Sequence, residues 1–372
     1  MRVLLVGNYQ FDGTTSMHIF ANGLRREFVK LGIDVKMIAP TPTLGLFKRS
    51  AVGLGKWLGY IDRFILFPRE LRAAAANADV IQICDHGSSM YATMVKNKPI
   101  VVTCHDMLAV RGALGEVGDC PASLFGRLLQ RWICRGMESA SLVACVSRST
   151  FEDARRILKS DGNIRVVLNG LIYPFRRLRA DEVDRRLAGI HGIEQPFILH
   201  VGSNLARKNR EGVLRIFRIA ADRTDLQLVF VGAALTEKLL QLAEKLQVSN
   251  RIVQIVKPDV EIVEALYNRA TALLFPSRYE GFGWPPIEAQ ACGCPVVGSD
   301  IPPLVEVLGQ SAILKPLEDE TGMAESIVRL STDREYHQQM QQLGLKNVSA
   351  RYKTSRMIEE YVSLYRELLC QS

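Results

Sequence analysis

Short runs of apolar residues alternate along the chain with longer stretches in which apolar residues recur every three or four positions. The first such stretch places Met17, Phe20, Leu24, Phe28 and Leu31 on one face of a helix. The runs predicted to be strands are Arg2–Gly7, Asp34–Pro40, Val80–Ile83, Ile100–Cys104, Leu142–Ser147, Ile164–Leu168, Phe197–Gly202, Leu226–Gly232, Arg251–Val256, Ala272–Phe275 and Pro295–Gly298. Strands that alternate with helices predict an α/β protein whose parallel sheets are covered on both faces and bind ligands beyond the carboxyl ends of the strands.

The strand and helix pattern restarts after residue 195, which predicts two doubly wound units facing each other across a cleft. We expect an N-terminal Rossmann-like domain over residues 1–172, a linker over 173–196, and a C-terminal Rossmann-like domain over 197–354. Residues 355–372 form a last helix with one apolar face, which must pack on a domain. The N-terminal domain is one candidate, but periodicity does not choose between the two.

The composition is that of a folded globular protein, because 48% of the 372 residues are hydrophobic and 23% are charged. No apolar run approaches the ~18 residues that would span a bilayer, and the opening MRVLLVGN lacks the apolar region of a signal peptide. The eight cysteines follow neither a disulfide framework nor a zinc-binding spacing. A secreted, membrane-spanning or zinc-finger protein is therefore not expected, and we predict a cytoplasmic location.

The charge is unevenly distributed between the two halves. Residues 1–172 contain 22 Lys and Arg against 14 Asp and Glu, whereas residues 173–372 contain 25 of each, so the first half carries the whole net charge of +8. A basic surface favours an anionic partner such as phospholipid head groups, pyrophosphate or nucleic acid. The alternative is that the excess charge only promotes solubility.

The segment Leu44–Leu71 combines basic residues with large aromatic ones. Its apolar residues Leu54, Trp57, Leu58, Ile61, Phe64 and Ile65 fall on one helical face. Such a helix can lie in a membrane interface at the inner face of the membrane, or it can turn this face toward the core of its own domain. Both interpretations remain open from the sequence.

The segment Phe275–Val297 carries the most informative motif. A strand ends near Pro276, a loop contains Glu280, Gly281 and Gly283, and a helix starts near Pro285, where proline suits the first turn. Backbone N–H groups beside a helix start form a ready anion site. Glu280 and Glu288 are eight positions apart, so both can face one cleft without sharing a proton.

This segment resembles the E-x7-E signature of retaining GT-B glycosyltransferases of glycosyltransferase family 4, also called group 1 glycosyltransferases. The resemblance continues through residues 298–314, and it also appears upstream in the segments 102–107, 167–170, 200–209 and 267–270. It implies the GT-B fold and transfer of a hexose from a UDP- or GDP-sugar to a saccharide or lipid-linked acceptor. The basic amphipathic segment Leu44–Leu71 favours an acceptor in polysaccharide or lipopolysaccharide synthesis.

The resemblance also assigns roles around the donor. Glu288 matches the family residue that holds the ribose hydroxyls. A carboxylate can accept hydrogen bonds from two neighbouring hydroxyls at once. Glu280 lies on the side of the donor sugar, and the N–H groups of Gly281, Phe282 and Gly283 approach the sugar and phosphate.

Arg207 and Lys208 follow a predicted strand, where the family keeps basic residues for the donor diphosphate. Many members have an arginine directly after the glycine at Gly202, but this chain has Ser203, so we expect Arg207 to supply the missing charge. Fixed cations can neutralise a leaving diphosphate without a metal. Since no Asp-x-Asp metal motif follows a strand, we predict a metal-independent reaction with no cofactor besides the nucleotide-sugar substrate.

His105 follows the predicted strand Ile100–Cys104, and the resemblance places it against the donor sugar or the acceptor hydroxyl. Asp12 and Gly13 match the glycine-rich loop of the family in part, because the usual double glycine is missing. The absence of a G-x-G-x-x-G motif after the first strand argues against a dehydrogenase.

Three other functions fit the sequence less well than glycosyl transfer. Another GT-B sugar-nucleotide enzyme, such as an epimerase or phosphorylase, fits the Glu280 segment less well, and Glu280, Glu288 and Lys208 argue against a non-catalytic binder. A nucleic-acid partner is not expected, because no known module or stacking platform accompanies the basic half. The expected partners are a nucleotide-sugar, a saccharide or lipid-linked acceptor, and an anionic membrane surface.

Overall fold

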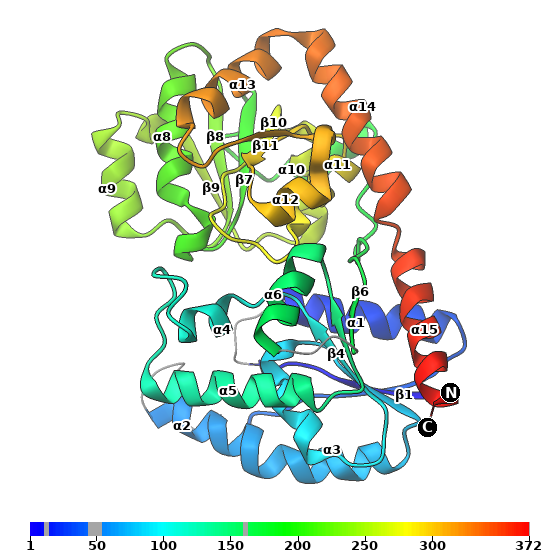
Figure 1. Cartoon of the computed structure of the whole chain (residues 1–372). Coiled ribbons are helices and arrows are strands. Elements are labelled where there is room, and N and C mark those ends of the chain that lie inside the picture. The colour runs from blue at the N-terminus through cyan, green and yellow to red at the C-terminus, as the bar shows by residue number, and fades with distance from the viewer. Residues whose placement is uncertain (11–14, 44–53, 159–162, 372) are drawn as a thin grey trace. The chain divides into compact units, whose positions relative to one another are not determined.

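A computed structural model describes residues 1–10, 15–43, 54–158 and 163–371 (Figure 1). The chain divides into two compact units. Unit 1 consists of Met1–Tyr173 together with Thr354–Ser372, and unit 2 is Pro174–Lys353. The chain therefore crosses from unit 1 into unit 2 after Tyr173 and returns after Lys353.

Unit 1 is built on a parallel sheet in the order β2-β1-β3-β4-β5-β6. Its strands are β1 (Arg2–Val6), β2 (Asp34–Ile38), β3 (Val80–Ile83), β4 (Ile100–Cys104), β5 (Leu142–Cys145) and β6 (Ile164–Val166). The strand order changes direction between β1 and β3, which pair directly. In open α/β sheets, ligands bind at such a switch point beyond the carboxyl ends of the strands.

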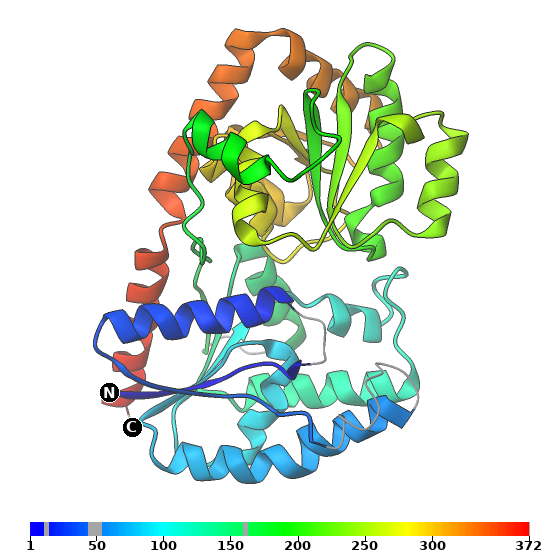
Figure 2. The same ribbon diagram turned by 180° about the vertical axis from the view of Figure 1, so that it is seen from behind.

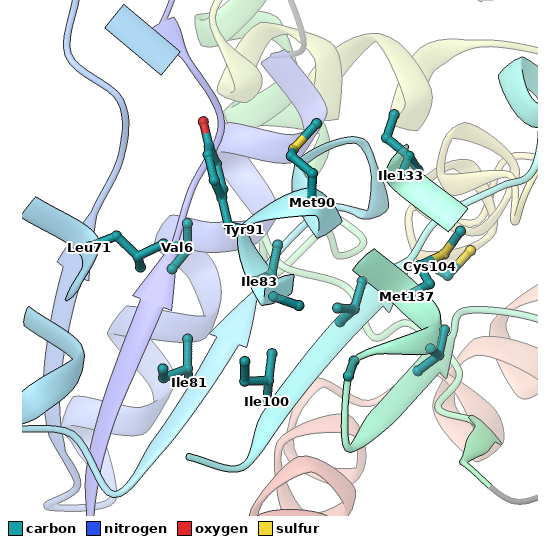
Figure 3. Packing of buried hydrophobic residues seen from close by; sticks show 14 of the residues in the cluster. Val6, Leu71, Ile81, Ile83, Met90, Tyr91, Ile100, Cys104, Ile133 and Met137 are labelled. Atoms are coloured by element: carbon teal, nitrogen blue, oxygen red, sulfur yellow. The ribbon is translucent and has the colours of Figure 1, made fainter. Parts of the chain in front are cut away.

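Helices cover both faces of this sheet (Figures 1 and 2). They are α1 (Thr15–Lys30), α2 (Leu54–Ile61), the π-helical turn η3 (Asp62–Leu66), α3 (Phe67–Ala76), the 3-10 segment η4 (His86–Met94), α4 (Leu108–Ala113), α5 (Leu124–Glu138), α6 (Arg148–Leu158) and α15 (Thr354–Cys370). One face of the sheet packs against α3, η4 and α5. Figure 3 shows this core, where Ile81, Ile83 and Ile100 of the strands meet Tyr91 and Ile133 of the helical layer.

The last helix, α15, belongs to unit 1. Tyr361 and Tyr365 are fully buried, and the Tyr361 hydroxyl lies 3.2 Å from Thr103 Oγ1 of β4. The ring of Tyr365 meets Phe28 of α1 with centroids 5.7 Å apart. The apolar face predicted for this helix is thus the face that covers unit 1.

Among its described side chains, the amphipathic segment buries part of the predicted apolar face, and contact of this segment with a membrane remains a prediction. Phe64 is half-buried and packs on Trp132 of α5 with ring centroids 5.2 Å apart. Leu58 and Ile61 are half-buried, and Ile65 is the exposed member among the described side chains of this face. The π-helical turn adds residues to one turn, so the side chains that follow it point in other directions than those of a regular helical stripe. The side chains of Leu54 and Trp57 lie outside the described residues.

Unit 2 has a second parallel sheet, in the order β12-β11-β10-β7-β8-β9. Its strands are β7 (Phe197–Gly202), β8 (Gln227–Gly232), β9 (Ile252–Val256), β10 (Ala272–Phe275), β11 (Val296–Ser299) and β12 (Ile313–Lys315). This is the strand order of a Rossmann sheet, and its direction changes between β7 and β10. The three-residue β12 was not predicted as a strand, since so short a run shows no periodicity of its own.

The helices of unit 2 surround this sheet (Figure 2). They are α7 (Ala180–Leu187), the short turn η5 (Ala206–Lys208), α8 (Arg210–Ala221), α9 (Glu237–Lys245), η6 (Ser249–Arg251), α10 (Val260–Arg269), α11 (Trp284–Ala291), α12 (Pro302–Leu308), η7 (Gly309–Ser311), α13 (Glu320–Thr332) and α14 (Arg334–Arg351). Helix α7 lies within residues 173–196, where a linker was expected. Arg186 of α7 is paired with the buried Glu264 of α10 at 2.6 Å.

Within residues 1–10, 15–43, 54–158 and 163–371, no helix is both long enough and apolar enough to cross a bilayer.

A close approach of two backbones in unit 1 gives a test of the fold. Gly136 of α5 lies against η4 so tightly that a Cβ there would be 2.2 Å from the Ser89 carbonyl oxygen. We expect Gly136→Ala to lower the free energy of unfolding by about 1–3 kcal/mol, because α5 must move away from η4. Urea unfolding followed by circular dichroism measures this loss.

Gly126→Ala in the same helix is the matched control. A Cβ at Gly126 would make ordinary contacts of 3.4 Å, so alanine there should leave stability unchanged or raise it by up to about 1 kcal/mol through helix propensity. Equal stability of the two variants would contradict the close packing of α5 on η4.

Candidate functional site

The switch point of the sheet in unit 2 brings two motif segments together. Strands β7 and β10 are hydrogen-bonded neighbours, with Ile198 opposite Ala272. Lys208 follows β7 in the turn η5, and Glu280 follows β10 in the loop that leads to α11. Because parallel strands end at the same edge of a sheet, these two side chains meet although they are 72 positions apart.

Glu280 is a buried carboxylate held by two cations. Lys208 Nζ donates to Glu280 Oε1 at 2.6 Å, and Arg207 Nη1 donates to Oε2 at 3.0 Å. Glu280 is 6% exposed and Lys208 is 7% exposed. Burial alone would raise the pKa of Glu280, but the charges of Lys208 and Arg207 hold this pKa below its usual range. Burial lowers the pKa of Lys208, while the charge of Glu280 acts to raise it. With all three side chains ionised, the group carries one net positive charge.

Glu288 lies on α11 and has a different environment. Tyr267 Oη of α10 donates to Glu288 Oε2 at 3.1 Å. Burial raises the pKa of Glu288 to about 7, although the Tyr267 hydrogen bond and the charge of Lys208 act in the opposite direction. A ligand that donates two hydroxyl hydrogen bonds would favour the ionised form of this carboxylate.

The loop between the two glutamates has little freedom. Gly283 has φ +97°, and a Cβ at this residue would lie 2.7 Å from Leu304 Cδ2, so glycine is required there. Helix α11 begins at Trp284, with Pro285 and Pro286 in its first turn. The two prolines have no N–H, so the backbone donors at this helix start belong to Trp284 and to the glycine loop before it. Phe282 is 5% exposed, and its ring is buried within unit 2.

Ser203, where many family members have an arginine, lies in the same loop as Arg207. Ser203 follows β7 and is half-buried, and Arg207, four residues later, pairs with Glu280. The side chain of Arg207 is 29% exposed, so part of its guanidinium remains accessible to a ligand.

Sequence reasoning missed Arg210, which fixes the loops at this edge. Arg210 is 4% exposed, and its guanidinium donates to the carbonyl oxygens of Gly202 at 2.6 Å and of Ala233 at 2.7 Å. It thereby ties the loop after β7 to the loop after β8. Burial lowers the pKa of Arg210 to about 10. Arg210 stands in a basic run with Arg207 and Lys208, and the sequence does not say which of these cations points inward.

Tyr267 was also not assigned to the site. It was noted only as part of the family resemblance, yet it is fully buried and donates a hydrogen bond to Glu288. Its spacing of 21 positions from Glu288 gives no signal of contact, because the two residues lie on different helices.

His105 lies in unit 1, at the carboxyl end of β4. It is 7% exposed, its Nε2 lies 2.9 Å from the carbonyl oxygen of Cys84, and its ring meets Phe20 edge to face at 4.8 Å. Burial lowers the pKa of His105 even though the nearby Asp85 acts to raise it, so the imidazole is neutral near pH 7. Asp85 in turn accepts a hydrogen bond from Asn8 Nδ2 at 2.5 Å, at the switch point between β1 and β3.

The remaining predicted site residues are Asp12 and Gly13, and no metal was expected. Asp12 and Gly13 lie outside the described residues. In the described part of the chain, no group of three or more His, Cys, Asp and Glu side chains has the geometry to hold a metal ion.

Two family models match the chain. The model described as "Glycosyltransferase Family 4" matches residues 17–172, and the model described as "Glycosyl transferases group 1" matches residues 186–346. The two models thus fall on the two units, and the second contains Lys208, Glu280 and Glu288.

Several curated proteins are similar to the chain. The O-antigen chain mannosyltransferase B of Escherichia coli is 29% identical over 314 residues, which cover 80% of this chain and 78% of the relative. N-acetyl-alpha-D-glucosaminyl L-malate synthase of Bacillus anthracis is 25% identical over 63% of the chain and 61% of its own length. The O-antigen chain mannosyltransferase RfbU of Salmonella typhimurium is 31% identical, but only 36% of the chain and 38% of the relative are covered. The chain thus spans less than two thirds of the last two relatives.

Solved structures share the fold. Sucrose-phosphate synthase from Thermosynechococcus elongatus superposes with a TM-score of 0.81 over the whole of both chains, at 19% identity. Anabaena HepE in complex with UDP-glucose gives a TM-score of 0.73 over 98% of this chain and 99% of its own, at 16% identity. These similarities confirm the GT-B fold predicted from the sequence. With both family models matched, the chain belongs to the group 1 glycosyltransferases of glycosyltransferase family 4.

Proposed function

We propose that the protein transfers a hexose from a nucleotide-sugar to a saccharide or lipid-linked acceptor, with retention of the anomeric configuration. The observation that carries this proposal is the buried group of Glu280, Lys208 and Arg207 beside Glu288, at the switch point of the sheet in unit 2. A net positive group next to a carboxylate that is ready to accept hydroxyls fits the two ends of a nucleoside diphosphate. The O-antigen relatives support an acceptor in polysaccharide or lipopolysaccharide synthesis.

Each side chain has a distinct role in this proposal. Glu288 accepts hydrogen bonds from the two ribose hydroxyls. Lys208 and Arg207 stabilise the negative charge that develops on the diphosphate as the bond to the sugar breaks, in a site that is already organised for it. Glu280 holds both cations in place on the side of the donor sugar, and the N–H groups of Gly281–Gly283 approach the sugar and phosphate. His105, as a neutral imidazole, accepts or donates a hydrogen bond to the sugar or acceptor.

UDP is the first nucleotide to test, because the structurally similar HepE was solved with UDP-glucose. The experiment is a screen of UDP- and GDP-sugars against a library of saccharide and lipid-linked acceptors, with products identified by mass spectrometry. We expect Lys208→Ala and Glu288→Ala to lose most of the turnover, by about 2–4 kcal/mol of transition-state stabilisation.

Lys238→Ala serves as the control for this pair of variants, since Lys238 is an exposed cation of the same unit with an 80% exposed side chain. Circular dichroism checks that each variant is folded. Turnover by both site variants near that of Lys238→Ala would remove Lys208 and Glu288 from the site.

We further propose that the transfer needs no metal ion, because Lys208 and Arg207 can neutralise the diphosphate. Turnover should be unchanged after dialysis against EDTA and should not rise when manganese or magnesium is added back. A strict requirement for either ion would mean that a metal, rather than these two cations, neutralises the leaving group.

We also propose that this enzyme is cytoplasmic and makes peripheral contact with an anionic membrane. The contact surface in this proposal is helix α5, and not the apolar face of Leu44–Leu71. Helix α5 exposes Leu124 at 80%, Leu128 at 60% and Phe125 at 43%. Its cations Arg127, Arg131 and Arg135 are exposed as well. The ring of Tyr60 in α2 contacts Phe125 with centroids 5.4 Å apart, so α2 lies beside α5, and Ile65 and Leu66 of η3 are exposed as well.

Such a surface should bind anionic vesicles and release them in salt. Each cation near an anionic bilayer contributes about 1 kcal/mol, and the apolar side chains enter the interface. The triple variant Leu124→Ser, Phe125→Ser and Leu128→Ser should lose most of its co-sedimentation with phosphatidylglycerol vesicles in low salt, with nucleotide affinity unchanged.

Leu240→Ser is the matched control, since Leu240 is an exposed leucine of unit 2. Wild-type protein that stays in the supernatant in low salt would overturn the membrane proposal and leave the transferase proposal intact.

A further inference from the structure

Aromatic residues lie beside both points where the chain crosses between the units, and each contacts an aromatic residue of the candidate donor site. Phe175 comes two residues after Tyr173, and its ring meets Tyr267 edge to face, with centroids 5.8 Å apart at 77°. Tyr352 comes two residues before Thr354, and its ring meets Phe282 at 5.6 Å and 79°. All four rings belong to unit 2.

The segment that carries Phe175 is fixed on the helix that carries Tyr267. The backbone N–H of Arg176 donates to Glu264 Oε1 at 2.9 Å, and that of Leu178 donates to Asn268 Oδ1 at 2.8 Å. Glu264 and Asn268 flank Tyr267 on α10. These two bonds fix the chain just after Phe175 on α10, next to Tyr267.

Tyr267 connects Phe175 to Glu288, because its ring contacts Phe175 and its hydroxyl bonds Glu288. Its ring is fully buried, so the edge contact with Phe175 limits where its hydroxyl can lie, and the hydroxyl donates to Glu288 Oε2 at 3.1 Å. Edge-to-face pairs of this kind contribute beyond the area they bury and prefer a defined geometry. The ring of Phe175 is therefore one of the contacts that fix the direction of this hydroxyl toward Glu288.

The second contact anchors the glycine loop. Phe282 stands between Gly281 and Gly283, which have no side chains, so its ring is the anchor of this part of the loop. The partner Tyr352 is fully buried, and its hydroxyl donates to the carbonyl oxygen of Val307 at 2.8 Å. Tyr352 is thereby fixed to the end of α12, and Phe282 is fixed to Tyr352.

We propose that Phe175 and Tyr352 are positioning residues for the donor site, Phe175 through Tyr267 and Glu288, and Tyr352 through Phe282 and the loop around it. This inference rests on the proposed function for its biological meaning. It adds that the two segments next to the crossings set the geometry of the ribose carboxylate and of the phosphate loop.

The titration of Glu288 tests the first contact without any nucleotide. The groups that face Glu288 are Tyr267 of α10, Lys208 of η5 and Cys292 of its own helix. A hydrogen bond to the ionised form lowers a carboxyl pKa, so its loss should raise the Glu288 pKa by about 0.5–1 unit. The pKa is read by NMR of the full chain with ¹³C-labelled glutamate carboxyls, and the Glu288 signal is assigned by its absence from Glu288→Gln.

We expect Tyr267→Phe to show this rise and Phe175→Leu to show a rise in the same direction. The double variant should rise no further than Tyr267→Phe alone, because both changes act through one hydroxyl. Phe217→Leu, which removes a fully buried ring of α8, is the control that should lower stability without moving the pKa. A Phe175→Leu protein with lower thermal stability and an unchanged Glu288 pKa would overturn this part of the proposal.

Hydrogen–deuterium exchange tests the second contact. Peptides covering residues 276–290 should exchange about tenfold faster in Tyr352→Leu, because the loop loses its anchor. Tyr352→Phe keeps the ring contact with Phe282 but loses the bond to Val307, so it should accelerate exchange less than Tyr352→Leu does. Phe282→Leu breaks the same contact from the loop side and should give the same acceleration, so the test remains decisive if Tyr352→Leu does not fold.

Tyr365→Leu is the matched control, since it removes a fully buried tyrosine ring from α15 of unit 1. Exchange over 276–290 should be unchanged in this variant. Unchanged exchange in both Tyr352→Leu and Phe282→Leu would show that Tyr352 is a core residue without a positioning role.

Calorimetry with UDP and GDP separates this inference from the proposed function. We expect Phe175→Leu and Tyr352→Leu to weaken the binding of the recognised nucleotide about 5–10-fold, and the donor KM to rise more than kcat falls. Wild-type protein that binds neither nucleotide and uses no donor would remove the proposed function. The NMR and exchange results would still decide whether the two residues position Glu288 and the loop.

Discussion

The buried charge of Glu280 is the constraint on which the rest of unit 2 depends. An ionised carboxylate that is 6% exposed is costly unless cations and hydrogen bonds compensate for its lost hydration. Lys208 and Arg207 provide this compensation, and both come from the other strand of the switch point. Loss of one partner of such a pair typically costs about 3–5 kcal/mol, so the loop after β7 and the loop after β10 are held together by electrostatics as well as by the sheet.

The two glutamates of the motif differ because their surroundings differ. Glu280 faces two cations and has a lowered pKa, whereas Glu288 has one hydroxyl donor and a pKa raised to about 7. Two carboxylates eight positions apart in the sequence therefore have pKa values shifted in opposite directions. Under the proposed function, Glu280 holds the two cations and Glu288 accepts the hydroxyls of the donor.

The supports of the site lie outside the motif. Arg210 ties the loops after β7 and β8 through their carbonyl oxygens, and Tyr267 orients toward Glu288 from a separate helix. Phe175 and Tyr352 add aromatic contacts from the segments beside the two crossings. The candidate site of unit 2 therefore lies at the switch point of the sheet, and the segments next to the two crossings contact it from outside the motif.

The sequence by itself determined the parallel α/β architecture, most of the strands, the restart of the pattern after residue 195 and the residues of the Glu280 motif. These features are local, since periodicity, turn residues and short motifs are visible within a few residues. Only the tertiary structure decided that Arg207 reaches Glu280 in a chain with Ser203, that Tyr267 bonds Glu288, and that Phe64 packs on Trp132. Each of these depends on which distant segment lies opposite a side chain, and burial by a distant segment leaves no periodic trace in the sequence.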